Sequence, residues 1–208
     1  MTDRIQSSIP FVGLHAHSGT GSPFDGLGYP SEHMDFAYQN GNDALALTDH
    51  GNMNGFAYQV QHAQKMMKEG KDFKPIFGVE AYFLPSIEEW REELERVKED
   101  KKAKKSIDKS ASGTTIENEE NKREVKNILN RRRHLILLAQ NQKGLNNIFS
   151  LVSKSYREEN FYRFPRIDYA MLKEHNEGVI AASACLGGVY AGNFWENREQ
   201  GDEAVLNA

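Results

Sequence analysis

The sequence predicts an α/β protein in which a sheet of parallel strands is covered by helices. Short apolar segments alternate with amphipathic segments of helical period along most of the chain, and glycines or capping residues separate them. Such alternation is typical of β/α units, whose consecutive strands run parallel. With 208 residues and 38% hydrophobic residues, the chain suits one or two domains, and part of it is expected to lie outside the core.

Five segments have the length and apolar content of strands. In chain order they are FVGLHAHS (11–18), DALALTDHGN (43–52), KPIFGVEAYFLP (74–85), HLILLAQN (134–141) and GVIAASACLGG (178–188). Helices are expected between them, because capping residues and glycines mark their ends. The expected helices are 31–39 with Ser31 as its cap, 54–69 closed by Gly70, 143–157, and 169–176 capped by Asp168.

A charged segment, 86–133, interrupts this alternation between the third and fourth strands. Its first part carries a stripe of four apolar residues at helical spacing, which indicates a surface helix. These residues are Ile87, Trp90, Leu94 and Val97. The stretch that follows, SIDKSASGTTIENEENK, has no apolar period and is expected to be mobile. We interpret 86–133 as an insertion in which a helix returns around 123–130.

Composition and charge argue against several classes of protein. No run of about 18 apolar residues is present, and the N-terminal segment lacks the apolar core of a signal peptide, so no membrane contact is expected. The single cysteine, Cys185, excludes an internal disulfide and favours a reducing cytoplasm. A formal net charge of -4 is no strong footprint for nucleic acid. Arg131, Arg132 and Arg133 can contact phosphate, but we prefer to interpret them as a solvated charged run.

Residues that commonly hold transition metals gather at the ends of the predicted strands. They are His15, His17, Asp25, Asp49, His50, Glu80, His134 and Cys185. Most lie at the C-terminal end of a strand or in the loop after it, although His134 begins its strand. The C-terminal ends of parallel strands are where α/β folds build their sites. The sequence therefore predicts a metal site at one rim of the sheet.

The spacing of His15 and His17 has a physical reason. Residues two apart in a strand point to the same side, so both imidazoles can reach one site. Neutral imidazoles need carboxylates beside them to balance the charge of a metal cluster, and Asp25 and Glu80 can supply these. The motifs HxH, TDH and GVE, each at a strand end, favour metal binding together more than any one does alone.

Each of these residues also has a structural interpretation. His15 and His17 can be satisfied by neighbouring backbone, Asp25 precedes a glycine in a common turn, and Cys185 can be a small buried hydrophobe. His134 can be an ordinary residue at the start of a strand. The apolar neighbours of Glu80 favour a partner cation, because a buried carboxylate without one is costly.

Asp49 and the three remaining histidines are expected to have supporting or surface roles. Asp49 can orient His50 or cap the next turn, and we expect it to hold an imidazole by a hydrogen bond. The remaining histidines lie on predicted helices among polar neighbours and are interpreted as surface residues. They are His33, His62 and His175.

The motifs HAHS, ALTDHGN, KPIFGVEAY, HLILLAQN, FYRFPRID and SACLGG together resemble a known family. The chain is similar to the PHP (polymerase and histidinol phosphatase) domain at the N-terminus of bacterial DNA polymerase III alpha subunits, from Phe11 to about Tyr190. The resemblance implies a distorted (β/α)7 PHP barrel, similar to a TIM barrel, over 1–208. This barrel would be incomplete at its C-terminus and would carry the charged insertion.

The resemblance also implies a cluster of up to three zinc or manganese ions at the strand ends. Seven of the nine ligands of the family have counterparts here. They are His15, His17, Asp25, His50, Glu80, His134 and Cys185. The other two, an Asp-x-His pair, have no counterpart before Ala208. We therefore expect the chain to be the N-terminal part of a larger polymerase.

The function implied by the resemblance is hydrolysis of a phosphoester by metal-activated water. In the polymerase branch this would be 3′–5′ proofreading at the end of a DNA strand, with DNA bound through the full-length polymerase and other replisome subunits as partners. The aspartates that catalyse polymerisation lie in later domains. Two alternatives remain open: a free-standing phosphatase of the histidinol phosphatase type, and a non-catalytic scaffold module.

Overall fold

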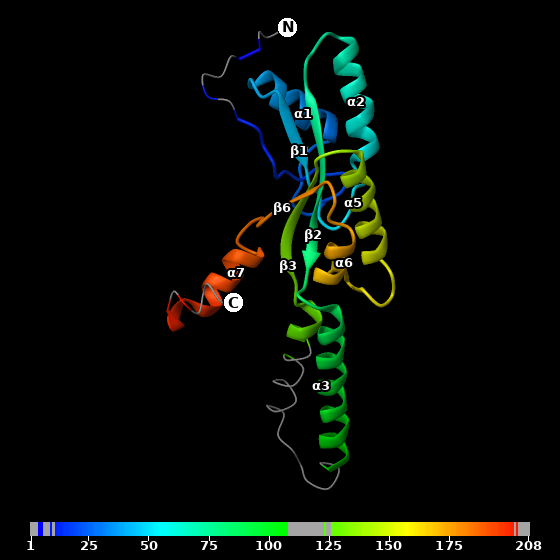
Figure 1. The fold of residues 1–208 in the computed structure, drawn as a ribbon, viewed down its shortest axis with the longest axis vertical. Helices are drawn as coiled ribbons and strands as arrows, with labels where there is room; N and C mark the ends of the chain where they lie inside the picture. Colours follow the sequence, from blue (N-terminus) through cyan, green and yellow to red (C-terminus); the bar gives the residue numbers. More distant parts are fainter. Residues whose placement is uncertain are drawn as a thin grey trace.

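A computed structural model describes residues 4–5, 9, 11–107, 123, 126–201 and 203. Its helices and strands alternate along the chain (Figure 1), which confirms the predicted α/β class. In chain order they are α1 (Pro30–Gln39), β1 (Ala44–Leu47), α2 (Phe56–Lys68), β2 (Lys74–Phe83), α3 (Ile87–Ile107), β3 (Arg133–Ala139), α5 (Gln142–Ser155), β4 (Phe161–Tyr162), β5 (Phe164–Ile167), α6 (Tyr169–Glu174), β6 (Val179–Ala182), α7 (Val189–Asn197) and a 3-10 turn (Arg198–Gln200).

The long strand β2 is the centre of a mixed sheet with the order β4-β5-β2-β3-β6. Its first half pairs in parallel with β1, and its C-terminal end pairs in parallel with β5. The strand β3 runs antiparallel to both β2 and β6. The prediction of a wholly parallel sheet is therefore wrong for β3.

The elements on either side of α3 explain the direction of β3. Helix α3 leaves the sheet at the C-terminal end of β2, and helical residues 126–130 lie beside it, where the indole of Trp90 donates to the carbonyl of Ile128 at 2.7 Å. Residues 126–130 thus hold the start of β3 near the end of β2, so β3 runs back along β2. His134 at the start of β3 thus lies opposite Tyr82 near the end of β2.

Helices cover one face of the sheet and leave the other to the candidate site. Helix α5 packs against β2, β3 and β5, and α1 packs against α2 and β1. Apolar residues of the strands and of α5 form the main core between them. They are Val79, Ala81, Phe83, Leu137 and Ile167 from the strands and Ile148 and Leu151 from α5. Because strand residues alternate between faces, Glu80 and Tyr82 point to the side away from this core.

The ends of the helices follow local chemistry. Helix α1 begins at Pro30, and Glu32 accepts a hydrogen bond from the backbone N–H of Tyr29 at 2.7 Å. The prediction that Ser31 caps this helix is wrong, because proline suits the first helical position, where no backbone N–H is needed. Asp168 caps α6 as predicted, accepting from the N–H of Met171 at 2.9 Å.

The first part of the predicted insertion forms the long helix α3, which extends beyond the sheet (Figure 1). Its predicted apolar stripe is buried in one cluster with Leu84 and Ile128. The stretch expected to be mobile lies almost entirely outside the described residues, at 108–122. No helix in the part of the chain that the structure describes is long and apolar enough to cross a membrane.

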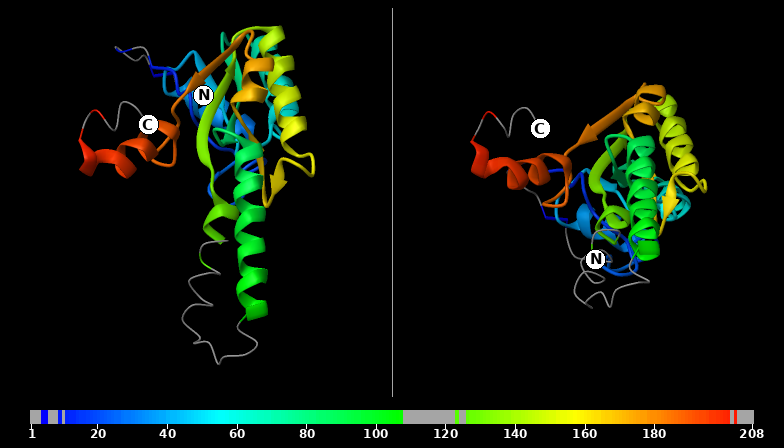
Figure 2. Two further views of the ribbon diagram at one scale, coloured as in Figure 1. Left: turned by 60° about the horizontal axis from the view of Figure 1, so that its bottom comes forward. Right: turned by 90° about the horizontal axis from the view of Figure 1, so that it is seen from below.

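The strand order ends at β4 on one side and at β6 on the other, and the N-terminal segment lies beside β1. The carbonyls of Gly13 and Ala16 accept from β1 and the residue after it at 2.8 Å, but the predicted strand at 11–18 is reduced to an isolated bridge. At the other side α7 extends away from the sheet after β6 (Figure 2). The sheet is not closed among the described residues, and its form fits a distorted, open β/α barrel.

Candidate metal centre

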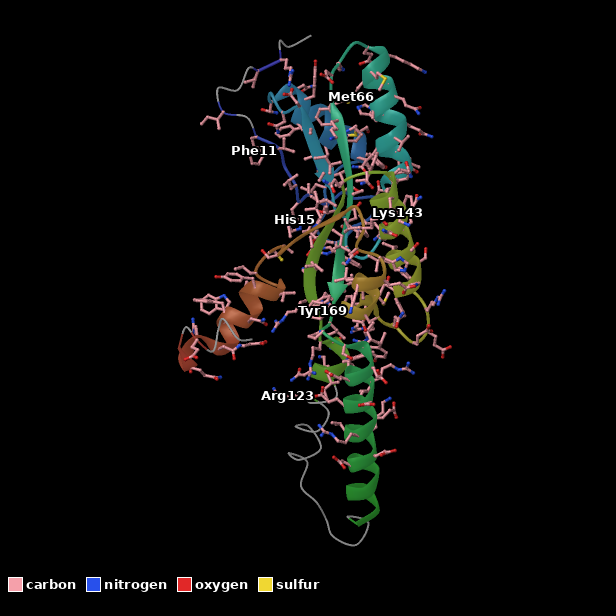
Figure 3. The ribbon with its side chains drawn as sticks, viewed as in Figure 1. Phe11, His15, Met66, Arg123, Lys143 and Tyr169 are labelled. Carbon is pink, nitrogen blue, oxygen red and sulfur yellow. The ribbon has the colours of Figure 1, made fainter. Side chains whose placement is uncertain are left out.

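The two histidines of the HxH motif converge on one buried carboxylate. The Nε2 atoms of His15 and His17 lie 2.7 and 2.6 Å from Oε2 of Glu80, and 3.2 Å from each other. Figure 3 shows His15 near the middle of the molecule, where the N-terminal segment meets the strands. The expected convergence is present although this segment is not a continuous strand, because its hydrogen bonds to β1 still hold it extended.

Two more histidines approach Glu80 from the strands beside β2. His50 forms a parallel bridge with Glu80, which places its Nδ1 atom 3.5 Å from Oε2. On the other side, Nδ1 of His134 contacts Oε1 of Glu80. The antiparallel direction of β3 makes this second contact possible, since it places the start of β3 beside the end of β2. Glu80 itself has no exposed surface.

Asp25 reaches the same cluster from the loop after the HxH motif. Its Oδ2 atom lies 2.8 Å from Nε2 of His50 and 3.2 Å from Nδ1 of His17, while half of its side chain remains exposed. The glycine that follows allows the loop to fold closely, because a Cβ atom on Gly26 would lie 2.4 Å from the carbonyl oxygen of Ser18. The Asp-Gly turn and the approach to the histidines therefore occur together.

These contacts form three overlapping groups of candidate ligands. The groups are His15/His17/Glu80, His17/Asp25/His50 and His50/Glu80/His134. Within each group one ligand atom per residue lies within 4.8 Å of the others. Mixed imidazole and carboxylate donors suit zinc and manganese. Nδ1 of His50 is buried and makes no hydrogen bond within the described residues, as expected of a nitrogen available to a metal ion.

The carboxylates of the cluster are held in their charged form. Burial alone would raise the pKa of Glu80, but the hydrogen bonds from His134 and His15 and the charge of His50 outweigh it and lower the pKa from 4.5 to about 2. Burial also raises the pKa of Asp25, but the hydrogen bond from His50 and its charge outweigh burial, so the pKa is lowered. Two anionic carboxylates beside four imidazole rings favour a cation.

The predicted ligand Cys185 lies beside the cluster but in none of the three groups. Its Sγ atom is 3.5 Å from Nδ1 of His134 and accepts from the N–H of Gly187 at 3.4 Å. Cys185 is exposed. Six of the seven predicted ligands are thus brought together, and the seventh neighbours one of them.

Asp49 occupies a different place from the one predicted. Its buried carboxylate accepts from the N–H and the hydroxyl of Ser18 at 2.7 and 2.8 Å and from the hydroxyl of Ser22 at 3.0 Å. No hydrogen bond joins it to an imidazole among the described residues, because both of its oxygens accept from Ser18 and Ser22 instead. Ser22 also accepts from the N–H of His50 at 3.0 Å, so Asp49 supports the site through this loop.

Tyr82 is a member of the site that the sequence analysis did not single out. Its ring stacks on His50 with an interplanar angle of 3° and a centroid distance of 5.9 Å, and it meets His134 edge-on at 5.4 Å. The available signal was its position two residues after Glu80, which places both on one face of β2.

The three histidines predicted to be surface residues are half-buried, so that prediction is wrong, and they lie outside the candidate ligand groups. His62 lies 2.9 Å from Oδ1 of Asp35, joining α2 to α1. His33 contacts the carbonyl of Leu27, and Nε2 of His175 lies 3.6 Å from Oε2 of Glu174.

The fold and this site define a class of protein: a mixed α/β protein whose open barrel carries a cluster of histidines and carboxylates suited to metal ions. A profile of the PHP domain matches residues 13–206. The chain therefore belongs to the PHP domain family, which the motifs resembled.

The chain is similar to DNA polymerase III alpha subunits of several bacteria. The chain is 36% identical over 183 residues to the DNA polymerase III subunit alpha of Aquifex aeolicus, and this match covers 88% of the chain and 13% of the relative. It is 35% identical over 190 residues to the same subunit of Borreliella burgdorferi, covering 90% of the chain and 13% of the relative. The chain thus spans about one eighth of the length of these relatives.

Among solved structures, an amidohydrolase from Chromobacterium violaceum with bound sulfate and no metal is similar at a TM-score of 0.37 and 17% identity. That match covers 69% of this chain and 32% of the amidohydrolase chain.

Proposed function

We propose that this PHP domain binds divalent metal ions and hydrolyses phosphoesters. The observation that carries the proposal is the overlap of the three ligand groups, in which His17, His50 and Glu80 each belong to two groups. Ions bound by overlapping groups lie close together, as in sites that act on phosphate esters. When bound, such ions lower the pKa of water and neutralise charge that develops on phosphoryl oxygens.

The residues of the chain have distinct roles in this proposal. The four histidines, Glu80 and Asp25 hold up to three zinc or manganese ions, and Cys185 adds a thiolate beside His134. The buried Glu80 supplies a fixed negative charge at the base of the cluster. The side chain of Asp25 is half exposed, so a substrate can reach it from solvent. Asp49 holds the serine loop so that the backbone of His50 stays in register with β2.

The relatives suggest the substrate. Because they are named DNA polymerase III subunit alpha, we infer that the phosphoester is the 3′ end of a DNA strand and that the activity is a 3′–5′ exonuclease. DNA and other replisome subunits would then be the partners, bound within a larger cytoplasmic polymerase.

The proposal is tested on the purified chain by metal analysis and by hydrolysis of bis(p-nitrophenyl) phosphate with Mn²⁺ or Zn²⁺. Glu80→Gln removes the charge shared by two ligand groups, and we expect it to reduce both metal content and hydrolysis at least about tenfold. His175→Ala is the matched control and should change neither. Wild-type chain without stoichiometric metal would contradict the proposal and leave a scaffold role. Hydrolysis that Glu80→Gln does not alter would contradict the catalytic part.

A further inference from the structure

The three consecutive arginines before and in β3 have different partners. Arg131 forms a two-pronged ion pair with Glu93, with Nη2 2.9 Å from Oε1. Arg133 contacts the carboxylate of Glu196. Arg132 contacts no carboxylate in the part of the chain that the structure describes. The preferred interpretation of the run as solvated charge therefore does not fit its middle member.

The guanidinium of Arg132 is held between aromatic rings. Its central carbon lies 3.7 Å from the ring centroid of Phe164 and 5.3 Å from that of Tyr82. Nη1 donates to the carbonyl of Asn130 at 2.9 Å, while Nε is buried without a hydrogen-bond partner among the described residues. Cation–π contacts fix the position of the cation but accept none of its hydrogen bonds. A buried N–H donor without an acceptor is unfavourable unless a ligand supplies one.

This guanidinium lies one aromatic ring away from the candidate metal centre. The ring of Tyr82, which Arg132 approaches, also contacts the rings of His50 and His134. The guanidinium of Arg132 and the ring of His134 both lie against Tyr82, which is on the same face of β2 as Glu80. The cluster of metal ligands and the cation thus share one side of the molecule.

The nearby Arg166 shows what a purely structural buried arginine looks like here. Its Nε, Nη1 and Nη2 atoms all donate to backbone carbonyls, four in number. For Arg132 a single carbonyl is the acceptor among the described residues. The planar fork of arginine matches two oxygens of a phosphate group, and these bonds are charge-assisted.

We propose that Arg132 is a substrate-binding residue that donates to a phosphate group of the phosphoester held at the metal centre. The inference rests on the proposed function, since the substrate class is the one assigned there. Phe164 and Tyr82 position the guanidinium in advance, so little side-chain freedom is lost when the phosphate binds.

Calorimetric titration of the full chain with inorganic phosphate tests the inference, once with Mn²⁺ and once with a chelator. We expect Arg132→Gln to weaken phosphate binding about tenfold or more in the Mn²⁺-loaded protein, the effect of one charge-assisted contact. Arg132→Lys keeps the charge without the fork and should give an intermediate loss. The matched control Arg131→Gln removes the same charge from a residue already paired with Glu93, and should change binding less than about twofold.

Metal content, measured on the same samples, separates this inference from the proposed function. Wild-type metal content with equal phosphate affinity in wild type, Arg132→Gln and Arg132→Lys would overturn the role of Arg132 and leave the metal centre standing. Loss of phosphate affinity in Arg132→Gln with unchanged metal content and melting temperature supports it. Phosphate binding that depends on Arg132 in a protein without metal would support the anion site while refuting the metal-dependent function.

Discussion

Two fully buried charges lie on neighbouring parallel strands, Glu80 on β2 and Arg166 on β5, and they are satisfied in different ways. Glu80 is surrounded by histidine side chains, each of which can bind a metal ion through a ring nitrogen. Arg166 is surrounded by backbone carbonyls that can do neither. The side chains around Glu80 can bind a metal ion, whereas the carbonyls around Arg166 can only hold the neighbouring segments in place.

The surroundings of Arg166 explain how α3 and the residues before β3 are held against the sheet. Its guanidinium lies 4.5 Å from the ring of Trp90 on α3, and its burial and the charge of Arg132 lower its pKa from 12.5 to about 10. It remains charged at neutral pH. The carbonyls it binds belong to the chain returning from α3 and to the β4–β5 hairpin. They are those of Leu129, Arg131, Tyr162 and Phe164.

The comparison shows that burial of a charge does not by itself mark a functional site. A charge met by fixed backbone dipoles organises the fold, while a charge met by several titratable side chains is suited to exchange with solvent ions. Three changes test this distinction, and they are ordered by the size of the expected effect.

The largest effect is expected from His15→Ala combined with His17→Ala. This change removes ligands from two of the three groups, so stoichiometric metal binding should be lost, as measured by elemental analysis after gel filtration. His33→Ala, outside the cluster, serves as the control and should keep its metal. Full metal content in the double variant would show that Glu80 and its histidines are only a hydrogen-bonded network.

Arg166→Met should lower the free energy of unfolding by about 3–5 kcal/mol, because the four carbonyls that the buried guanidinium binds lose their donors at once. Urea denaturation of the chain measures this change. Arg163→Met on the same hairpin is exposed and should stay within about 0.5 kcal/mol. Metal content of the folded Arg166→Met protein should be unchanged, since no ligand is altered. If Arg166→Met were stable but lost its metal, the purely structural role of Arg166 would be contradicted.

The smallest effect is a difference in pH dependence when the protein is kept metal-free by a chelator. The folded-state pKa of Glu80, about 2, lies below its ordinary value of 4.5, so its stabilising contribution is complete above pH 4.5 and is lost as the pH falls through 2. Wild type should therefore lose about 3 kcal/mol more than Glu80→Gln across this window, at about 1.4 kcal/mol per pKa unit. The exposed Glu158→Gln should behave as wild type. Parallel stability curves for wild type and Glu80→Gln would refute the lowered pKa.

Local signals predicted a large part of the molecule. The apolar stripe of α3, the cap at Asp168 and the candidate ligands at strand ends all depend on residues close together in the sequence. Period and capping chemistry act over a few residues, so they can be seen without knowing how the chain folds.

Other features depended on contacts between distant segments. The antiparallel pairing of β3 with β2 brings His134 to Glu80 and Arg132 to Tyr82. The carboxylate of Asp49 accepts from Ser18 and Ser22, which lie thirty-one and twenty-seven residues earlier in the sequence, and not from an imidazole of the described residues. Local patterns in the sequence show which chemical groups are present and on which elements they lie. Which of these groups meet depends on the tertiary fold, because strand pairing and side-chain contacts are set by packing over the whole chain.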